Sequence, residues 1–163
     1  MTVTRVGLIS DTHGLLRPEV FRAFDGVDLI LHAGDVGDAS ILTDLAALAP
    51  VSAVWGNVDG WEVRDATRQS LRLEIGGLDV AVTHGHLVAD LDRLPDRFPG
   101  ARVIVYGHTH LPRSELRGRV RIVNPGSAGP RHAGAPVTVA TLEIADGRAR
   151  VRHLDLQTGL DYA

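Results

Sequence analysis

The chain has 163 residues, enough for one domain with a sizeable buried core and too few for two. A net charge of −3 gives no electrostatic signal for nucleic-acid binding, and the absence of cysteine excludes disulfides, thiolate nucleophiles and cysteine-based zinc sites. No apolar stretch approaches the roughly 20 residues that a membrane helix needs. We therefore expect a single domain over residues 1–163 of a cytoplasmic protein that has no membrane partner, with homo-oligomerisation left open.

The first half of the chain alternates strand and helix patterns. Apolar runs predict strands at residues 3–9, 28–32 and 51–55. A first helix is predicted after Pro18, with Val20, Phe21 and Phe24 on one face. A second helix, capped by Asp38 or Ser40, has apolar residues at helical spacing from Ile41 to Ala49 and ends at Pro50. This β-α-β-α-β order needs right-handed crossovers and implies a largely parallel sheet.

The second half is richer in hairpins. The sequence predicts a surface loop at residues 60–70, where Trp61 could fold back over a site, and a hairpin over residues 71–83 around Gly76-Gly77. A helix is predicted around Leu87, Leu91 and Leu94, broken by Pro95 and Pro99. Strands follow at residues 102–106 and 120–123, then a closing hairpin over residues 136–156, and the tail from Gln157 is expected to fray. The mixture predicts an α/β sandwich.

Polar side chains follow six of the predicted strands, directly after each strand ends. They are Asp11 and His13, Asp35, Asn57 and Asp59, His84 and His86, His108 and His110, and Asn124 and Ser127. In open α/β sheets the carboxyl ends of the strands line the ligand crevice, so we expect these side chains to converge. In extended backbone the spacing of His108 and His110 would direct both rings to one side. Each residue alone is typical of a turn or a surface, but the whole set is not.

The residue types in this set indicate a metal centre. Without cysteine the donors are imidazole nitrogens and carboxylate or amide oxygens, which suit Mn, Fe, Co, Ni or Zn rather than Ca or Mg. About seven donors are too many for one tetrahedral ion. They fit two ions roughly 3.5–4 Å apart that share a carboxylate, an arrangement that serves displacement at phosphorus. We expect Mn²⁺ first, with Ni²⁺, Fe²⁺, Co²⁺ or Zn²⁺ as alternatives.

Five motifs in this order resemble the calcineurin-like metallophosphoesterase superfamily. They are Asp11-Thr12-His13, Gly34-Asp35, Gly56-Asn57-Val58-Asp59, His84-Gly85-His86 and Gly107-His108-Thr109-His110. The short chain, Thr83 before the fourth motif and the later Asn124-Pro125-Gly126-Ser127 are similar to its small YfcE-like phosphodiesterase branch. The resemblance implies a four-layer αββα sandwich, which agrees with the predicted elements.

The resemblance also implies a role for each residue. Asp11, His13 and His110 would bind one metal, Asn57, His84 and His108 the other, and Asp35 would bridge both. A hydroxide that bridges the metals would then attack phosphorus in line with the leaving alcohol of a small phosphodiester. Our candidate catalytic residues are Asp35, Asn57 and His86, and the chain is expected to be a metal-dependent phosphodiesterase.

One position departs from the family pattern. Many members carry a histidine after the asparagine, and that histidine protonates the leaving group; here the residue is Val58. Valine cannot act as a general acid, so we expect weak turnover of monoesters with poor leaving groups and better turnover of activated diesters. His86 is the nearest candidate to replace the missing acid.

A non-catalytic alternative uses the same fold. The retromer subunit related to this family acts as an interaction surface, so the chain could be a metal-binding or protein-interaction scaffold. The sequence favours the enzyme, because every ligand position holds a competent ligand.

Overall fold

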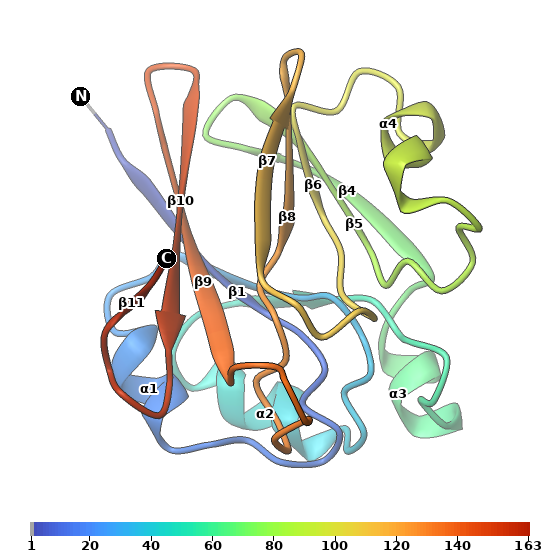
Figure 1. Ribbon diagram of the computed structural model, residues 1–163, viewed down its shortest axis with the longest axis vertical. Helices are drawn as coiled ribbons and strands as arrows, with labels where there is room; N and C mark the ends of the chain where they lie inside the picture. The colour runs from blue at the N-terminus through green and yellow to red at the C-terminus, as the bar shows by residue number, and fades with distance from the viewer. Residues whose placement is uncertain (1) are drawn as a thin grey trace.

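Two mixed β-sheets dominate the computed structural model, which describes residues 2–163 (Figure 1). The first sheet has the order β11-β10-β9-β1-β2-β3, with β1 (Thr4–Ile9), β2 (Leu29–His32) and β3 (Val51–Ala53) parallel, and β9 (Thr138–Ala145), β10 (Arg148–Asp155) and β11 (Asp161–Tyr162) antiparallel. The second sheet has the order β4-β5-β6-β8-β7, formed by β4 (Ser70–Ile75), β5 (Leu78–Thr83), β6 (Val103–Val105), β7 (Arg113–Arg117) and β8 (Val120–Asn124). The parallel first half and the hairpin-rich second half are as predicted.

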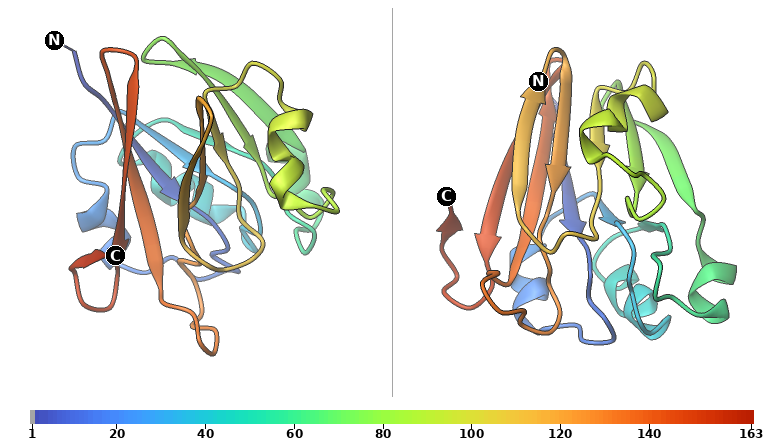
Figure 2. Two further views of the ribbon diagram at one scale, coloured as in Figure 1. Left: turned by 45° about the horizontal axis from the view of Figure 1, so that its top comes forward. Right: turned by 45° about the vertical axis from the view of Figure 1, so that its right-hand side comes forward.

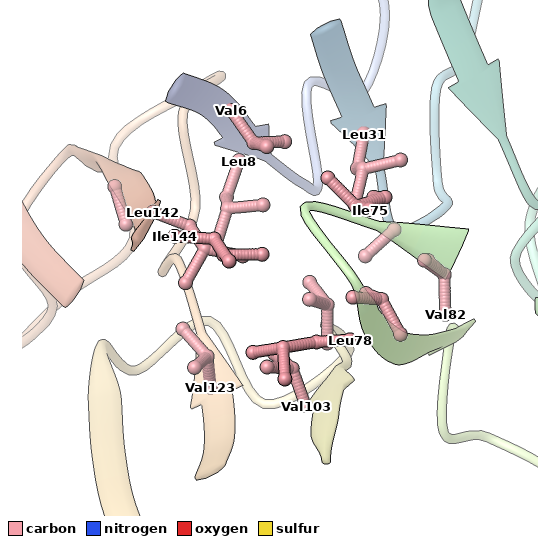
Figure 3. Packing of buried hydrophobic residues seen from close by; sticks show 14 of the residues in the cluster. Val6, Leu8, Leu31, Ile75, Leu78, Val82, Val103, Val123, Leu142 and Ile144 are labelled. Carbon is pink, nitrogen blue, oxygen red and sulfur yellow. The ribbon is translucent and has the colours of Figure 1, made fainter. Parts of the chain in front are cut away.

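The two sheets pack face to face through aliphatic side chains. Figure 3 shows Leu8 and Leu31 of the first sheet facing Val103 and Val123 of the second, in a cluster from which water is excluded. Outside the first sheet lie α1 (Glu19–Ala23) and α2 (Ser40–Ala46), and outside the second lie the short 3₁₀ turn η1 (Leu91–Arg93) and α4 (Leu94–Arg97). In Figures 1 and 2, α4 lies away from α1 and α2. The predicted four-layer αββα sandwich is therefore confirmed.

Strand register places the polar loops at one end of the molecule. Ile9 pairs with His32 and His32 with Ala53, so three parallel strands of the first sheet end side by side. Val82 pairs with Val105 in the second sheet, which aligns the ends of β5 and β6 in the same way. The hairpin turns β4–β5, β7–β8 and β9–β10 lie at the opposite end (Figure 1).

The surface loop predicted over residues 60–70 is wrong, because it contains helix α3 (Trp61–Ala66). Val63 is buried, and Arg64 donates from Nε to the carbonyl of Asp59 over 2.8 Å. The burial of Val63 and this local bond stabilise a helix too short to form alone. Trp61 is 76% exposed on the first turn of this helix.

The predicted helix around Leu87 is also wrong in extent. Leu87 is exposed outside any helix, and Pro95 does not break the helix but lies in the first turn of α4, where its missing N–H costs nothing. Phe21 of α1 is 37% exposed, unlike Val20 and Phe24.

Two strands were missing from the prediction. Strand β7 has a largely polar sequence, because it lies at a sheet edge and buries little. The predicted fraying of the tail from Gln157 is wrong, because residues 161–162 pair with β10 as β11 at the edge of the other sheet.

Candidate metal centre

The loops at the strand ends hold their histidines and aspartates in a rare backbone conformation. Six non-glycine residues of the described chain have positive φ, and five of them are candidate ligands. These five are Asp11, His13, Asp35, His108 and His110. Such conformations cost about 1–3 kcal/mol each and concentrate at functional sites. The segment from His108 to His110 is therefore not extended, and the prediction that both rings point to one side of a strand is wrong.

A first ligand group consists of Asp11, His13 and His110. Oδ1 of Asp11 lies 3.4 Å from Nε2 of His110 and 3.7 Å from Nε2 of His13. Both Asp11 Oδ1 and His13 Nε2 are buried without a hydrogen-bond partner. Buried polar atoms are rarely left unpaired, so this group has room for a cation that would pair them.

A second ligand group consists of Asn57, His84 and His108. Nε2 of His84 lies 3.1 Å from Oδ1 of Asn57. Donor atoms of His84, His108 and Asp35 lie within 4.8 Å of one another. Four histidines and Asn57 are thus divided between two neighbouring clusters.

Asp35 lies between the two groups. Its Oδ2 is 3.2 Å from Nε2 of His84 and 3.8 Å from Nε2 of His13. The same carboxylate oxygen therefore faces one histidine from each group, which is the position that a shared ligand requires.

Hydrogen bonds fix the direction of these candidate ligands. His84 contacts the carbonyl of Ala33 through Nδ1 over 2.8 Å, and only a protonated Nδ1 can donate to a carbonyl. When His84 is neutral, the lone pair of Nε2 is therefore available for a metal. Asp11 accepts at Oδ2 from the Ser10 hydroxyl and from the backbone N–H of His108, which leaves its Oδ1 for the first ligand group.

The electrostatics of the site suit a cation. Burial favours the neutral form of Asp11, but contacts with His110 and His13 outweigh it and lower the pKa of this carboxyl. At Asp35 burial likewise raises the pKa of the carboxyl, but the contact with His84 outweighs it, so the pKa is lowered. The pKa of His13 is raised by its contact with Asp11, and that of His84 is raised by Asp35 against the effect of burial. A metal ion would replace the protons that these lone pairs attract.

A buried network joins the first two loops beneath the site. The backbone N–H of Gly34 donates to Nδ1 of His32, so Nε2 of His32 carries the proton and donates to the hydroxyl of Thr12 over 3.0 Å. That hydroxyl donates in turn to the carbonyl of Val36. Burial lowers the pKa of His32 to about 4, and the residue is neutral within the network.

Three residues from the predicted set support the loops and lie outside both ligand groups. The carboxylate of Asp59 accepts from the backbone N–H groups of Val36, Gly37 and Gly56. Asn124 donates from Nδ2 to the carbonyl of Gly107, and Ser127 donates to the carbonyl of Asp11. They hold the ligand loops to each other.

Two further histidines lie beside the ligand groups. The ring centroid of His86 lies 5.5 Å from that of Trp55 and 5.4 Å from that of His84. Its Nδ1 is buried without a hydrogen-bond partner. His132, which the sequence did not single out, lies beside His13 and His110. In the sequence, only its position shortly after the predicted strand end at residues 124–127 indicates that it could lie near the site.

Comparisons with known proteins identify the family of the chain. Residues 4–147 match the calcineurin-like phosphoesterase superfamily domain, and the chain therefore belongs to this superfamily. A probable metallophosphoesterase of Methanothermobacter thermautotrophicus is 41% identical over 75% of this chain and 76% of its own. A phosphodiesterase of Methanocaldococcus jannaschii is 28% identical over 85% of this chain and 92% of its own.

A solved structure has a similar fold. The structure of wild-type Vps29 complexed with Zn²⁺ from Entamoeba histolytica has a TM-score of 0.81 and 26% identity, and covers 98% of this chain and 96% of its own. Within residues 2–163, no helix has the length and apolar character needed to cross a membrane.

Proposed function

We propose that the chain is a phosphodiesterase that uses two divalent transition-metal ions to hydrolyse a small phosphodiester. The observation that carries this proposal is the position of Asp35 Oδ2 between His13 and His84. A shared carboxylate between two nitrogen-rich clusters favours two adjacent ions over two separate sites. The family and the homologous phosphodiesterase support the same reaction class.

The candidate ligands would bind two ions. Asp11, His13 and His110 would hold the first ion, Asn57, His84 and His108 would hold the second, and Asp35 would contact both. Such a pair of ions supplies a nucleophilic hydroxide at neutral pH and stabilises negative charge on the phosphoryl oxygens. Nitrogen and oxygen donors suit Mn²⁺, Ni²⁺, Fe²⁺, Co²⁺ and Zn²⁺.

The leaving group would receive little help from residue 58. The Val58 side chain is 57% exposed and has no proton to give, so esters with activated leaving groups should be the better substrates. His86 is our candidate proton donor, because it lies next to His84 at the edge of the second ligand group.

Hydrolysis of bis-p-nitrophenyl phosphate tests the function. We expect metal-stripped protein to be inactive and to regain activity with Mn²⁺ or Ni²⁺, and we expect Asp35→Asn to lose most of it. Asp38→Asn, an exposed aspartate outside the site, is the matched control. A lack of metal-stimulated activity, or full activity in Asp35→Asn, would contradict the enzyme and leave the scaffold alternative.

Metal content of purified variants tests the division into two groups. His108→Ala should deplete mainly one ion and His110→Ala mainly the other, because the two rings lie in different clusters. Equal loss of both ions from either variant would contradict this division.

A further inference from the structure

The loop between β8 and β9 carries His132 over the first ligand group. Near its start, the backbone N–H of Ala128 donates to the carbonyl of Ser10, and Arg17 donates from Nε to the carbonyl of Gly129. Beyond the histidine, Ala135 donates its N–H to the carbonyl of His132 and closes a turn. The two bonds before the residue thus hold the loop to residues 10 and 17, and the Ala135 bond shapes the turn that carries His132.

The ring of His132 contacts both histidines of the first ligand group. Its centroid lies 3.9 Å from that of His110, with 23° between the ring planes, and 5.9 Å from that of His13. One ring nitrogen from each of the three histidines lies within 4.8 Å of the other two. Nε2 of His132 is itself buried and has no hydrogen-bond partner.

Three buried atoms without hydrogen-bond partners therefore belong to residues in and beside the first ligand group. They are Nε2 of His132, Nε2 of His13 and Oδ1 of Asp11. A ring nitrogen of His132 lies within 4.8 Å of one of His13, and His13 Nε2 lies 3.7 Å from Asp11 Oδ1. Leaving such atoms buried and unpaired is costly, and His13 connects the other two, so the cluster indicates a bound partner. All three are potential electron-pair donors, and a cation is the partner that accepts from all of them.

We propose that His132 is an additional ligand of the first metal site, which then binds its ion through three histidines, Asp11 and the shared Asp35. Zn–N bonds of 2.0–2.1 Å place two nitrogens of one ion roughly 3.3–4.1 Å apart. The three ring nitrogens lie within 4.8 Å of one another, so small ring rotations suffice to reach this spacing. His13, His110 and His132 are each only partly buried and have room to turn. This inference rests on the proposed metal centre but does not depend on which ester is hydrolysed.

A third imidazole changes the metal preference of the site. Imidazole suits Zn, Cu, Fe and Ni, whereas Mn is better served by oxygen donors. The first site should therefore prefer Zn²⁺ over Mn²⁺ more strongly than the second site, which has two histidines and the amide oxygen of Asn57. His132 supplies this preference without altering Asp35.

Calorimetric titration of the metal-free protein with Zn²⁺ and with Mn²⁺ tests the proposal. We expect His132→Ala to weaken Zn²⁺ binding at one site at least about tenfold, to weaken Mn²⁺ less, and to leave the other site unchanged. Arg131→Ala, at the exposed neighbouring position on the same loop, should leave both affinities unchanged. Circular dichroism of the metal-free variants checks that they are folded.

Two replacements separate ligation from ring stacking. His132→Phe keeps a ring against His110 but has no donor atom, and it should behave like His132→Ala. His132→Cys has a thiolate that binds zinc, and it should recover much of the affinity. Unchanged Zn²⁺ affinity in His132→Ala, or normal affinity in His132→Phe, would overturn the proposal. If Zn²⁺ binding behaves as expected but no phosphodiester is hydrolysed, the proposed function fails and the ligand assignment stands.

Discussion

The backbone N–H of Val58 donates to Oδ1 of Asp35 over 3.1 Å. This bond fixes one carboxylate oxygen, so the other, Oδ2, faces the histidines of both ligand groups. The residue that departs from the family pattern thus still contributes through its main chain. Its side chain is free to vary because it points outward.

Val58→His should add the missing proton donor. The side chain is 57% exposed, so a larger residue fits, and the N–H bond to Asp35 is retained. For diesters with alkyl leaving groups we expect turnover to rise toward the roughly 10²-fold lower end of general-acid effects, with little change for nitrophenyl esters. Val58→Gln is the control, because it is polar but not acidic. Equal rates in all three proteins on alkyl esters would contradict the expectation.

His86→Ala should slow substrates with poor leaving groups in a pH-dependent way. Burial, together with His84 and His108, lowers the pKa of His86 below its usual 6.5. A general acid must hold its proton, so the wild-type rate on an alkyl ester should fall as the pH rises through that lowered pKa. The variant should lose both the rate and this fall, while its rate on bis-p-nitrophenyl phosphate stays close to wild type. A pH–rate profile identical to wild type on the alkyl ester would remove His86 from the mechanism.

The sequence predicted the strand-end residues of the site because the physical rule behind them is local. Asp11, Asp35 and His84 each follow an apolar run, and parallel pairing brings such ends together whatever the loops do. The apolar runs that predict the strands also place these residues at the strand ends. The fold and most of the candidate metal centre therefore follow from the same pattern.

His132 and α3 could not be predicted in this way. Their positions depend on contacts between distant segments, such as the Arg17 bond to Gly129 near His132 and the burial of Val63 in α3. A side chain on Gly129 would overlap the carbonyl of Thr12, so the approach of this loop also depends on one glycine. Hydrophobic periodicity in the sequence does not predict such contacts between distant segments.

Gly56→Ala should disrupt the shared ligand without straining the backbone. Gly56 does not have positive φ, but an added Cβ would overlap Oδ1 and the backbone nitrogen of Asp35. We expect at least about tenfold weaker metal binding and a loss of about 1–3 kcal/mol in the free energy of unfolding from overpacking. Gly60→Ala is the matched control, because nothing lies within 4 Å of its added Cβ. Calorimetric metal titration and urea unfolding measure the two effects; equal behaviour of the two variants would contradict this account.

Replacing His108 tests the cost of its backbone conformation. At a φ of 72°, glycine fits without strain and alanine does not. In metal-free protein, His108→Gly should therefore be more stable to urea than His108→Ala by about 1 kcal/mol. His86 does not have positive φ, so there the order should reverse and the alanine variant should be the more stable. The same order at both positions would show that strain at His108 is not the cause.

His32 should make the protein sensitive to acid. Its pKa falls from 6.5 to about 4 on folding, so the unfolded chain takes up a proton between these values that the native chain does not. The contribution of His32 to the free energy of unfolding is therefore fully present above pH 6.5. It falls by about 3 kcal/mol as the pH drops to 4. His13 and His84 have raised pKa values and act in the opposite direction, so the wild-type curve alone does not isolate His32.

Comparison with His32→Asn isolates the contribution of His32, because the other groups titrate in both proteins. Asparagine can still accept the N–H of Gly34 but has no proton to gain in this range. Urea unfolding in a chelator at several pH values should show the wild type clearly more stable at pH 7. The difference in the free energy of unfolding between the wild type and His32→Asn should narrow by about 3 kcal/mol by pH 4. Parallel stability curves would mean that His32 is protonated in the native protein, and that Gly34 N–H does not donate to a bare Nδ1.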